Sequence, residues 1–136
     1  MTWKPKSPLV ATDCIIRYEG GIILIERKYP PLGWAIPGGM VEIGETVEQA
    51  VRREMKEETN LELEDLRLFG VYSDPSRDPR FHVVSIVYTA DGIGELKEGD
   101  DAKVARVFKL DELPEQIVFD HLTIIRDYFN RGPQGH

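Results

Sequence analysis

The sequence predicts an α/β fold in which a mixed β-sheet packs against helices. The order of elements supports this, because strands, one helix, further strands and a last helix follow one another along the chain. Size agrees, since 136 residues are enough for one domain with a substantial core. Composition agrees as well, because 41% hydrophobic and 30% charged residues are ordinary for a globular protein. We therefore expect residues 1–136 to form a single domain.

The first third of the chain reads as a hairpin followed by a broken segment. Residues 9–16 and 22–26 are apolar enough to be strands, and the sequence Glu-Gly-Gly at 19–21 supplies the turn between them. A short strand-like piece follows at 34–36. The Pro-Gly-Gly sequence at 37–39 interrupts the pattern again, which predicts a loop at this point.

The remaining elements are one central helix, three strands and a C-terminal helix. The helix is expected near 46–59, and the strands at 66–72, 83–89 and 105–108. Asp120 is a suitable N-cap for the last helix, which should end near Gly132. Helices in these places would pack against the sheet.

Charge and composition exclude several classes of function. The net charge is −7, from 24 acidic and 17 basic residues, and no basic cluster suited to a nucleic acid polymer is present. An anionic substrate would then need a divalent cation to offset repulsion. The lone cysteine, Cys14, excludes an internal disulfide and reads as a small buried residue. No apolar stretch has the length of a membrane span, and the N-terminal residues lack a signal-peptide core, so we expect a cytoplasmic protein without a membrane partner.

The central helix has a well-marked start and an apolar stripe. Thr46 and Gln49 form a capping box. At about 100° per residue, the apolar stripe covers roughly −60° to +80° around Val47, and Glu54 and Glu58 fall inside it at about −20° and +20°. Glu57, at about −80°, lies on the margin of the stripe. Two acids therefore point where the core should be.

Such acids are unfavourable unless a cation holds them together. Glu54 and Glu58 are like charges at i,i+4, which costs the helix a few tenths of a kcal/mol, and all three acids lie toward the negative end of the helix dipole. A solvated charged face is the ordinary explanation of an acidic run, but it does not fit these two positions. Converging carboxylates suit Mg²⁺ or Mn²⁺, which would also contact phosphate oxygens. Arg53 would fork onto one carboxylate and fix its rotamer.

These residues resemble the Nudix box, the signature of a family of pyrophosphohydrolases. The match covers residues 39–61 and reads Gly39-x5-Glu45-x7-Arg53-Glu54-Met55-Lys56-Glu57-Glu58-Thr59-Asn60-Leu61. The resemblance implies the Nudix α/β/α sandwich, with a mixed sheet between helices. Asn60 stands where the family usually has Gly, a change that should cost little because Asn also accepts the left-handed conformation after a helix.

The resemblance also implies roles for the box residues. Glu54, Glu57 and Glu58 would bind the divalent ions, and a backbone carbonyl at Gly38 or Gly39 would be a further ligand. Glu45 and Arg53 would shape the loop and orient the ligands.

The implied reaction is attack of an activated water on phosphorus. Family members differ in which acid takes the proton from that water. Glu57 is our first choice for this base, and Glu98, in the acidic loop at 95–101, is the second.

A second set of motifs bears on the substrate. The loop at 72–82 is stiffened by two prolines and carries Arg77 and Arg80, which could reach phosphates or a terminal ribose phosphate. Together with 99–102 and 119–121, this loop is similar to the microbial ADP-ribose pyrophosphatase branch of the family. By that analogy Arg27 is a further phosphate contact, and the products are AMP and ribose 5-phosphate.

Two other functions remain open on the sequence alone. A house-cleaning enzyme that hydrolyses oxidised or non-standard nucleoside triphosphates would share the box and the fold. A catalytically silent Nudix domain would bind a nucleotide for regulation, although the intact set Glu54, Glu57 and Glu58 argues against it. The partner is a small nucleotide in each case, and the sequence leaves open whether the chain forms a homodimer.

Overall fold

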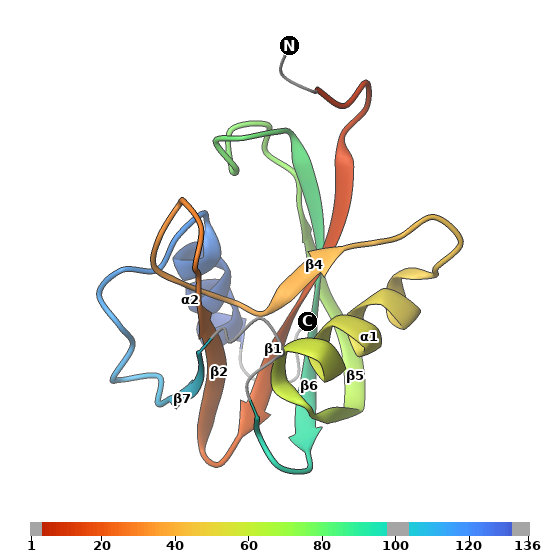
Figure 1. Cartoon of the computed structure of the whole chain (residues 1–136). Coiled ribbons are helices and arrows are strands. Elements are labelled where there is room, and N and C mark those ends of the chain that lie inside the picture. Colours follow the sequence, from red (N-terminus) through yellow and green to blue (C-terminus); the bar gives the residue numbers. More distant parts are fainter. Residues whose placement is uncertain (1–3, 98–103, 132–136) are drawn as a thin grey trace.

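Among the residues that the structure describes, a seven-stranded mixed sheet flanked by two helices forms the fold (Figure 1). The computed structural model describes residues 4–97 and 104–131. In chain order the elements are β1 (Leu9–Tyr18), β2 (Gly21–Glu26), β3 (Trp34–Ala35), β4 (Gly38–Met40), α1 (Val47–Thr59), β5 (Glu62–Tyr72), β6 (Val83–Ile93), β7 (Ala105–Phe108) and α2 (His121–Arg131).

The sheet has parallel and antiparallel pairs, as predicted. Its order is β3-β2-β1-β6-β5, with β4 paired to β1 and β7 paired to β2. Strand β1 runs parallel to β6, and every other strand pair is antiparallel. Four strands are longer than the sequence predicts, because neighbouring strands supply partners beyond the apolar runs. Strand β5, for example, begins at Glu62 rather than at residue 66, opposite Ile93 at the end of β6.

Strand alternation gives the sheet two buried faces. Cys14 and Ile16 of β1 pack with Val51 and Met55 of α1 on one face. Ile15, between them in the chain, packs on the other face with residues of α2 that include Ile124. The two helices therefore cover opposite faces of one sheet, which confirms the predicted sandwich.

Both ends of α1 are fixed as the sequence predicts. The Thr46 hydroxyl accepts a hydrogen bond from the backbone N–H of Gln49 at 3.1 Å, and the Gln49 side chain accepts one from the backbone N–H of Thr46 at 2.9 Å. Asn60 ends the helix in the left-handed region, with φ of 68°. Within residues 4–97 and 104–131, no helix is long and apolar enough to cross a bilayer.

The Pro-Gly-Gly segment differs from its prediction. Gly38 and Gly39 belong to the short strand β4 and pair with Asp13 and Thr12 of β1. Glycine permits this close approach, because a methyl group at Gly38 would overlap the Asp13 carboxylate. The pairing brings the start of the Nudix box motif against the centre of the sheet.

Candidate active site

Arg53 of α1 gathers the acidic side chains that follow β4. Its guanidinium donates two hydrogen bonds to Glu45, with Nε and Nη2 at 2.7 and 2.9 Å from the carboxylate oxygens. Nη1 donates to Glu54 at 2.6 Å and to Glu57 at 3.3 Å, and Nη2 donates to the carbonyl of Met40 at 3.2 Å. One side chain thus ties the loop before the helix to two acids on the helix.

The contact with Arg53 changes the pKa of Glu45, which accepts two hydrogen bonds from the guanidinium. Hydrogen bonding to Arg53, and then to the backbone N–H of Glu42, lowers the pKa of Glu45 to about 2. The same pairing with Glu45 raises the pKa of Arg53 above its ordinary value. Both groups are therefore charged at neutral pH, and the fork is a fixed part of the site.

The three helical acids differ in exposure as the helical wheel predicts. The Glu58 residue is only 7% exposed, and the Glu54 side chain is 15% exposed. The Glu57 side chain is 58% exposed. Gly39 lies directly against Glu54, because a methyl group there would overlap the Glu54 carboxylate. A strand backbone and two sheltered carboxylates therefore share one small region.

These donors suit a hard divalent cation. Carboxylate oxygens and a backbone carbonyl are the ligands that Mg²⁺ and Mn²⁺ prefer, and glycine in β4 lets the backbone approach. Over the part of the chain that the structure describes, no three acidic, histidine or cysteine side chains are already gathered around one metal position. Arg53 accounts for part of this, since it draws Glu54 and Glu57 toward itself.

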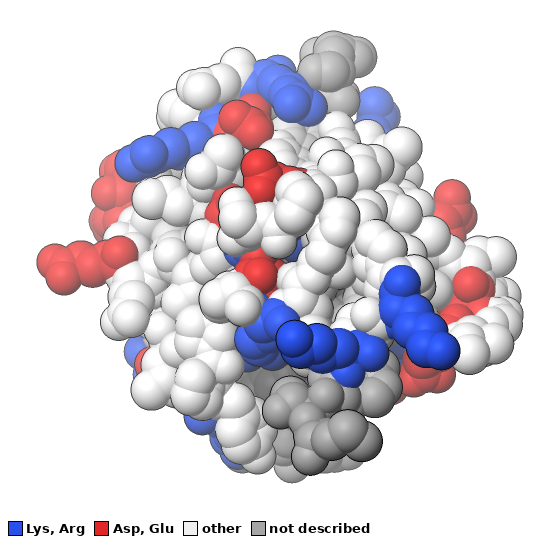
Figure 2. Space-filling view, turned by 90° about the horizontal axis from the view of Figure 1, so that it is seen from above, with Lys and Arg blue, Asp and Glu red and all other residues white. Residues whose placement is uncertain are grey.

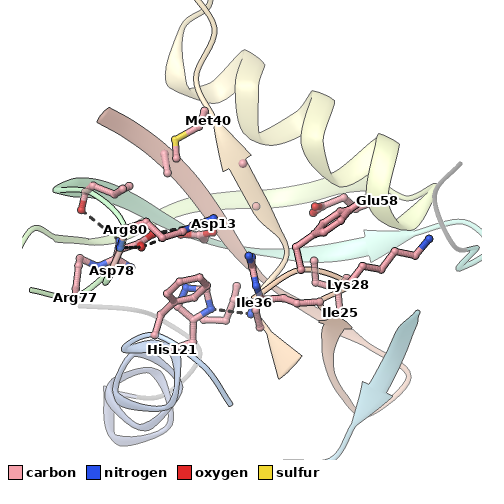
Figure 3. Close-up of a pocket in the computed structure, with 18 residues that line it drawn as sticks. Asp13, Ile25, Lys28, Ile36, Met40, Glu58, Arg77, Asp78, Arg80 and His121 are labelled. Atoms are coloured by element: carbon pink, nitrogen blue, oxygen red, sulfur yellow. Dashed lines mark hydrogen bonds and ion pairs between the residues drawn. The ribbon is translucent and has the colours of Figure 1, made fainter. Parts of the chain in front are cut away.

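A pocket of about 160 Å³ opens beside these acids. Glu58 and Gly39 line it on one side, and Figure 3 shows Arg77, Asp78 and Arg80 on the other. Figure 2, which looks down on this end of the molecule, shows acidic side chains in the middle of the face with basic ones above and below. Glu58 thus faces, across the pocket, a wall that carries Arg77 and Arg80 together with Asp78; we call it the basic wall, because its arginines suit phosphate.

The basic wall is organised around the ring of Phe119. The guanidinium carbon of Arg27 lies 4.9 Å from the ring centroid, and that of Arg80 lies 5.4 Å from it. Arg80 also forms an ion pair with Asp78 at 2.8 Å, while Nε of Arg27 donates to the carbonyl of Pro31 at 2.8 Å. Burial lowers the pKa of Arg27, and the nearby Arg80 lowers it further. Two cations that repel each other would gain from an anion placed between them.

Arg77 lies in the same pocket but has a different environment. Its side chain is 5% exposed and makes a two-pronged ion pair with Asp120, with nitrogen–oxygen distances of 2.9 and 2.8 Å. It also donates to the carbonyl of Val83 at 3.3 Å. Arg77 therefore ties the loop between β5 and β6 to the start of α2, and this ion pair occupies much of its guanidinium.

Residues 119–121 form a corner at the start of α2, and the neutral side chain of His121 holds this corner in place. Nδ1 of His121 accepts a hydrogen bond from the backbone N–H of Ile36 at 3.0 Å (Figure 3). Burial lowers the pKa of His121 to about 4, so the ring is neutral at physiological pH and can accept this bond. Phe119 precedes it with φ of 59°, an uncommon value for an aromatic residue, and its ring lies 5.2 Å from that of His121.

Asp13 is a pocket residue that the sequence does not single out. Its carboxylate accepts a short hydrogen bond from the hydroxyl of Ser85 and lies against Gly38 of β4. Burial raises the pKa of Asp13 to about 6. A lone acid in an apolar strand was the available signal, since such a residue is rarely buried without a partner.

The sequence-predicted residues fall into three groups. Gly39, Glu58, Arg27, Arg77 and Arg80 all line the pocket. Arg53, Glu54 and Glu57 are not among the lining residues; they form the fork described above, in which Glu54 lies against the lining residue Gly39. Glu98 lies outside the described residues.

Comparison with known proteins gives three kinds of match. The sequence model of the NUDIX domain matches residues 7–128. An ADP-ribose pyrophosphatase of Methanocaldococcus jannaschii is 56% identical over 124 residues, which cover 89% of this chain and 73% of that protein.

Solved structures give matches over most of the chain. The MutT NUDIX hydrolase of Burkholderia pseudomallei aligns with a TM-score of 0.80 and 32% identity, over 89% of this chain and 98% of that one. A bifunctional NMN adenylyltransferase/ADP ribose pyrophosphatase of Francisella tularensis, complexed with AMP and Mn ion, aligns with a TM-score of 0.79 and 28% identity. That alignment covers 96% of this chain and 43% of the other.

Proposed function

Because the chain belongs to the Nudix hydrolase family, we propose that it cleaves the pyrophosphate bond of ADP-ribose to give AMP and ribose 5-phosphate. Proteins of this family use divalent metal ions, and we propose Mg²⁺ or Mn²⁺ for this chain. The similarity to an ADP-ribose pyrophosphatase at 56% identity supports the choice of substrate.

The pocket with Glu58 on one side and the basic wall on the other is the observation that carries this proposal. A diphosphate needs cations on both sides, because its two phosphates carry negative charge where the reaction occurs. Glu54, Glu57 and Glu58 supply one side by holding metal ions, with the carbonyl of Gly39 as a further ligand. Arg27 and Arg80 supply the other side directly.

A divalent ion bound there supplies positive charge for the phosphate oxygens and makes the attacking water more acidic. The protein's own groups orient the reactants and take the proton. Glu57 is the base that we propose, because its carboxylate is exposed toward solvent and is held only by the longer contact with Arg53, at 3.3 Å. Glu98 is the alternative base.

Arg53 and Arg77 act as positioning residues in this proposal. Arg53 keeps Glu54 in place beside Gly39 while it anchors the loop through Glu45. Arg77 fixes the corner at 119–121 through Asp120, so that the Phe119 ring lies beside Arg27 and Arg80. Direct phosphate contact is assigned to Arg27 and Arg80 only.

Product identification tests the proposal. The purified chain is incubated with ADP-ribose and Mg²⁺, and the products are separated by anion-exchange chromatography. We expect AMP and ribose 5-phosphate in equal amounts, and we expect EDTA to stop the reaction. Absence of AMP formation with both Mg²⁺ and Mn²⁺ would reject ADP-ribose as the substrate.

A further inference from the structure

Two large apolar side chains that line the pocket are exposed to solvent. Tyr29 is 73% exposed, and Met40 of β4 is 40% exposed. Over the described part of the chain, no other aromatic ring and no guanidinium stacks on the ring of Tyr29. Tyr29 therefore offers a free aromatic face at the mouth of the pocket, which a flexible thioether such as Met40 cannot do.

The loop that carries Tyr29 spans residues 27–33, between β2 and β3, and Arg27 holds it closed. The backbone N–H of Arg27 donates to the carbonyl of Gly33 at 2.8 Å. Its Nε donates to the carbonyl of Pro31, also at 2.8 Å. Because these bonds fix the loop, a ligand that contacts the Tyr29 ring does not have to order the loop first.

The pocket has room for only part of ADP-ribose. Its volume is about 160 Å³. Pockets that enclose most of a drug-sized ligand usually measure roughly 300–1,000 Å³. In the proposed function the diphosphate occupies this space, between the metal ions and the guanidinium groups of Arg27 and Arg80. The uncharged base and much of the two riboses must then lie at the mouth or beyond it.

Among these outer parts of the substrate, the adenine base suits Tyr29 best. A base has a flat aromatic face that stacks on a tyrosine ring, whereas a ribose has hydroxyl groups and no such face. Arg27 and Tyr29 are two positions apart in the chain, so their Cα atoms lie within roughly 7 Å of each other. Only one ribose separates the base from its phosphate. A phosphate bound at Arg27 therefore leaves the base within reach of Tyr29.

We propose that the ring of Tyr29 is the stacking surface for the adenine base of ADP-ribose, at the mouth of the pocket. The inference rests on the proposed function, because it assumes that the phosphate next to the nucleoside binds at Arg27. It makes Tyr29 a determinant of specificity for the nucleoside end of the substrate, through contact with the base and not with a phosphate.

Product inhibition tests this assignment, because AMP carries the base and ribose 5-phosphate does not. In Tyr29→Ala, the inhibition constant of AMP should rise roughly fivefold or more, the effect of losing one base-stacking contact. The inhibition constant of ribose 5-phosphate should stay within about twofold of the parent value, as for a surface substitution that touches no ligand. Tyr29→Phe keeps the ring, so both constants should stay within about twofold.

Leu32→Ala is the matched control. Leu32 is an apolar residue of the same loop, 54% exposed, that does not line the pocket. Both inhibition constants should stay within about twofold in this variant. Equal responses of Tyr29→Ala and Leu32→Ala would overturn the proposal, and so would a rise in the ribose 5-phosphate constant instead of the AMP constant. A loss in Tyr29→Phe as large as that in Tyr29→Ala would also overturn it, because the hydroxyl group and not the ring would then bind.

The two proposals can fail separately. If the parent does not cleave ADP-ribose, the proposed function fails, and calorimetric titration of the parent and Tyr29→Ala with AMP still reports on stacking at Tyr29. If the parent cleaves ADP-ribose and Tyr29→Ala keeps the parent inhibition constant of AMP, only the assignment of Tyr29 fails.

Discussion

The hydrogen bonds from Arg53 to the three acids around it differ in length. Glu45 and Glu54 accept hydrogen bonds at 2.7 and 2.6 Å, whereas Glu57 accepts one at 3.3 Å. Tightly held carboxylates are suited to orienting other groups, because their rotamers are fixed. Glu57, more exposed and more weakly held, is better suited to move a proton.

At the scale of single residues, we predict that Glu57→Gln lowers turnover of ADP-ribose by at least ~10²-fold, the contribution of one general base. The fold should remain intact, because the Glu57 side chain is 58% exposed. Steady-state kinetics at saturating Mg²⁺ measure the first effect, and far-ultraviolet circular dichroism measures the second.

Glu48→Gln is the control for Glu57→Gln, since it makes the same change on an exposed position of the same helix. Its turnover should equal that of the parent. Parent-like turnover in Glu57→Gln would remove Glu57 from the chemistry. A deep loss in Glu98→Gln together with that result would move the base to the loop at 95–101.

The ion pair between Glu45 and Arg53 should make stability depend on pH. The ordinary pKa of this carboxyl is 4.5, and hydrogen bonding to Arg53 lowers it to about 2 in the folded chain. A lowered folded pKa means that ionised Glu45 stabilises the fold above pH 4.5 and that this contribution is lost as the pH falls toward 2. Glu45→Gln should therefore melt at a lower temperature than the parent at pH 7.

The difference in Tm between parent and Glu45→Gln should shrink through the interval from pH 4.5 to about 2. Thermal melts at several pH values within and above this interval measure it. A difference that is the same at pH 3 and pH 7 would show that Glu45 contributes no charge-dependent stability.

At the scale of elements, α1 is the part of the site that sequence reasoning describes well. Its start at Thr46, its end at Asn60 and the burial of Glu58 all follow from local rules of capping and helical periodicity. Local rules suffice here because the residues involved lie within a few turns of one another in the chain.

The contacts of β4 and Asp13 could not be predicted in the same way. Gly38 and Asp13 are 25 positions apart in the printed sequence and meet only because β4 pairs with β1. The Pro-Gly-Gly sequence reads locally as a break, and tertiary pairing overrides that signal. Arg77 is a similar case, since its partner Asp120 lies on another element and no local pattern links them.

Helix α1 should be less stable in the absence of metal than its caps suggest. Glu58 is 7% exposed and lies one turn from Glu54 on the same face, so their charges repel at close range. We predict that Glu58→Gln raises the Tm of the metal-free protein. It should also reduce the increase in Tm on adding Mg²⁺, because a ligand of the ion is lost.

Melts with and without Mg²⁺, for the parent, Glu58→Gln and Glu48→Gln, test this prediction. The Glu48 variant removes a favourable acid from the first turn of the same helix, so its metal-free Tm should fall slightly while its response to Mg²⁺ stays that of the parent. An unchanged Mg²⁺ response in Glu58→Gln would exclude Glu58 as a metal ligand.

At the scale of the whole molecule, the distribution of charge matters more than its sum. The chain carries a net charge of −7, yet Arg27 and Arg80 converge on one ring at the pocket. An anionic substrate would be repelled by the molecule as a whole and attracted at this wall and at the divalent ions that we propose for Glu54, Glu57 and Glu58. Strand β1 connects the basic wall to the acids, because it pairs with β4 on one side and with β6 on the other.

This arrangement predicts a preference for a diphosphate that continues beyond the pocket. A nucleoside triphosphate ends at its phosphates, whereas ADP-ribose continues beyond its diphosphate into a second ribose. Contacts to this remote sugar would lower the barrier of the chemical step as well as improve binding.

Direct competition between ADP-ribose and nucleoside triphosphates, oxidised purines included, at a single Mg²⁺ concentration decides whether ADP-ribose is the preferred substrate. The ratio of kcat/KM values should favour ADP-ribose over every triphosphate by roughly tenfold or more, because remote binding contributes to the transition state. A preference of roughly tenfold or more for any triphosphate would contradict the assignment of ADP-ribose, because the remote contacts would then contribute nothing to catalysis.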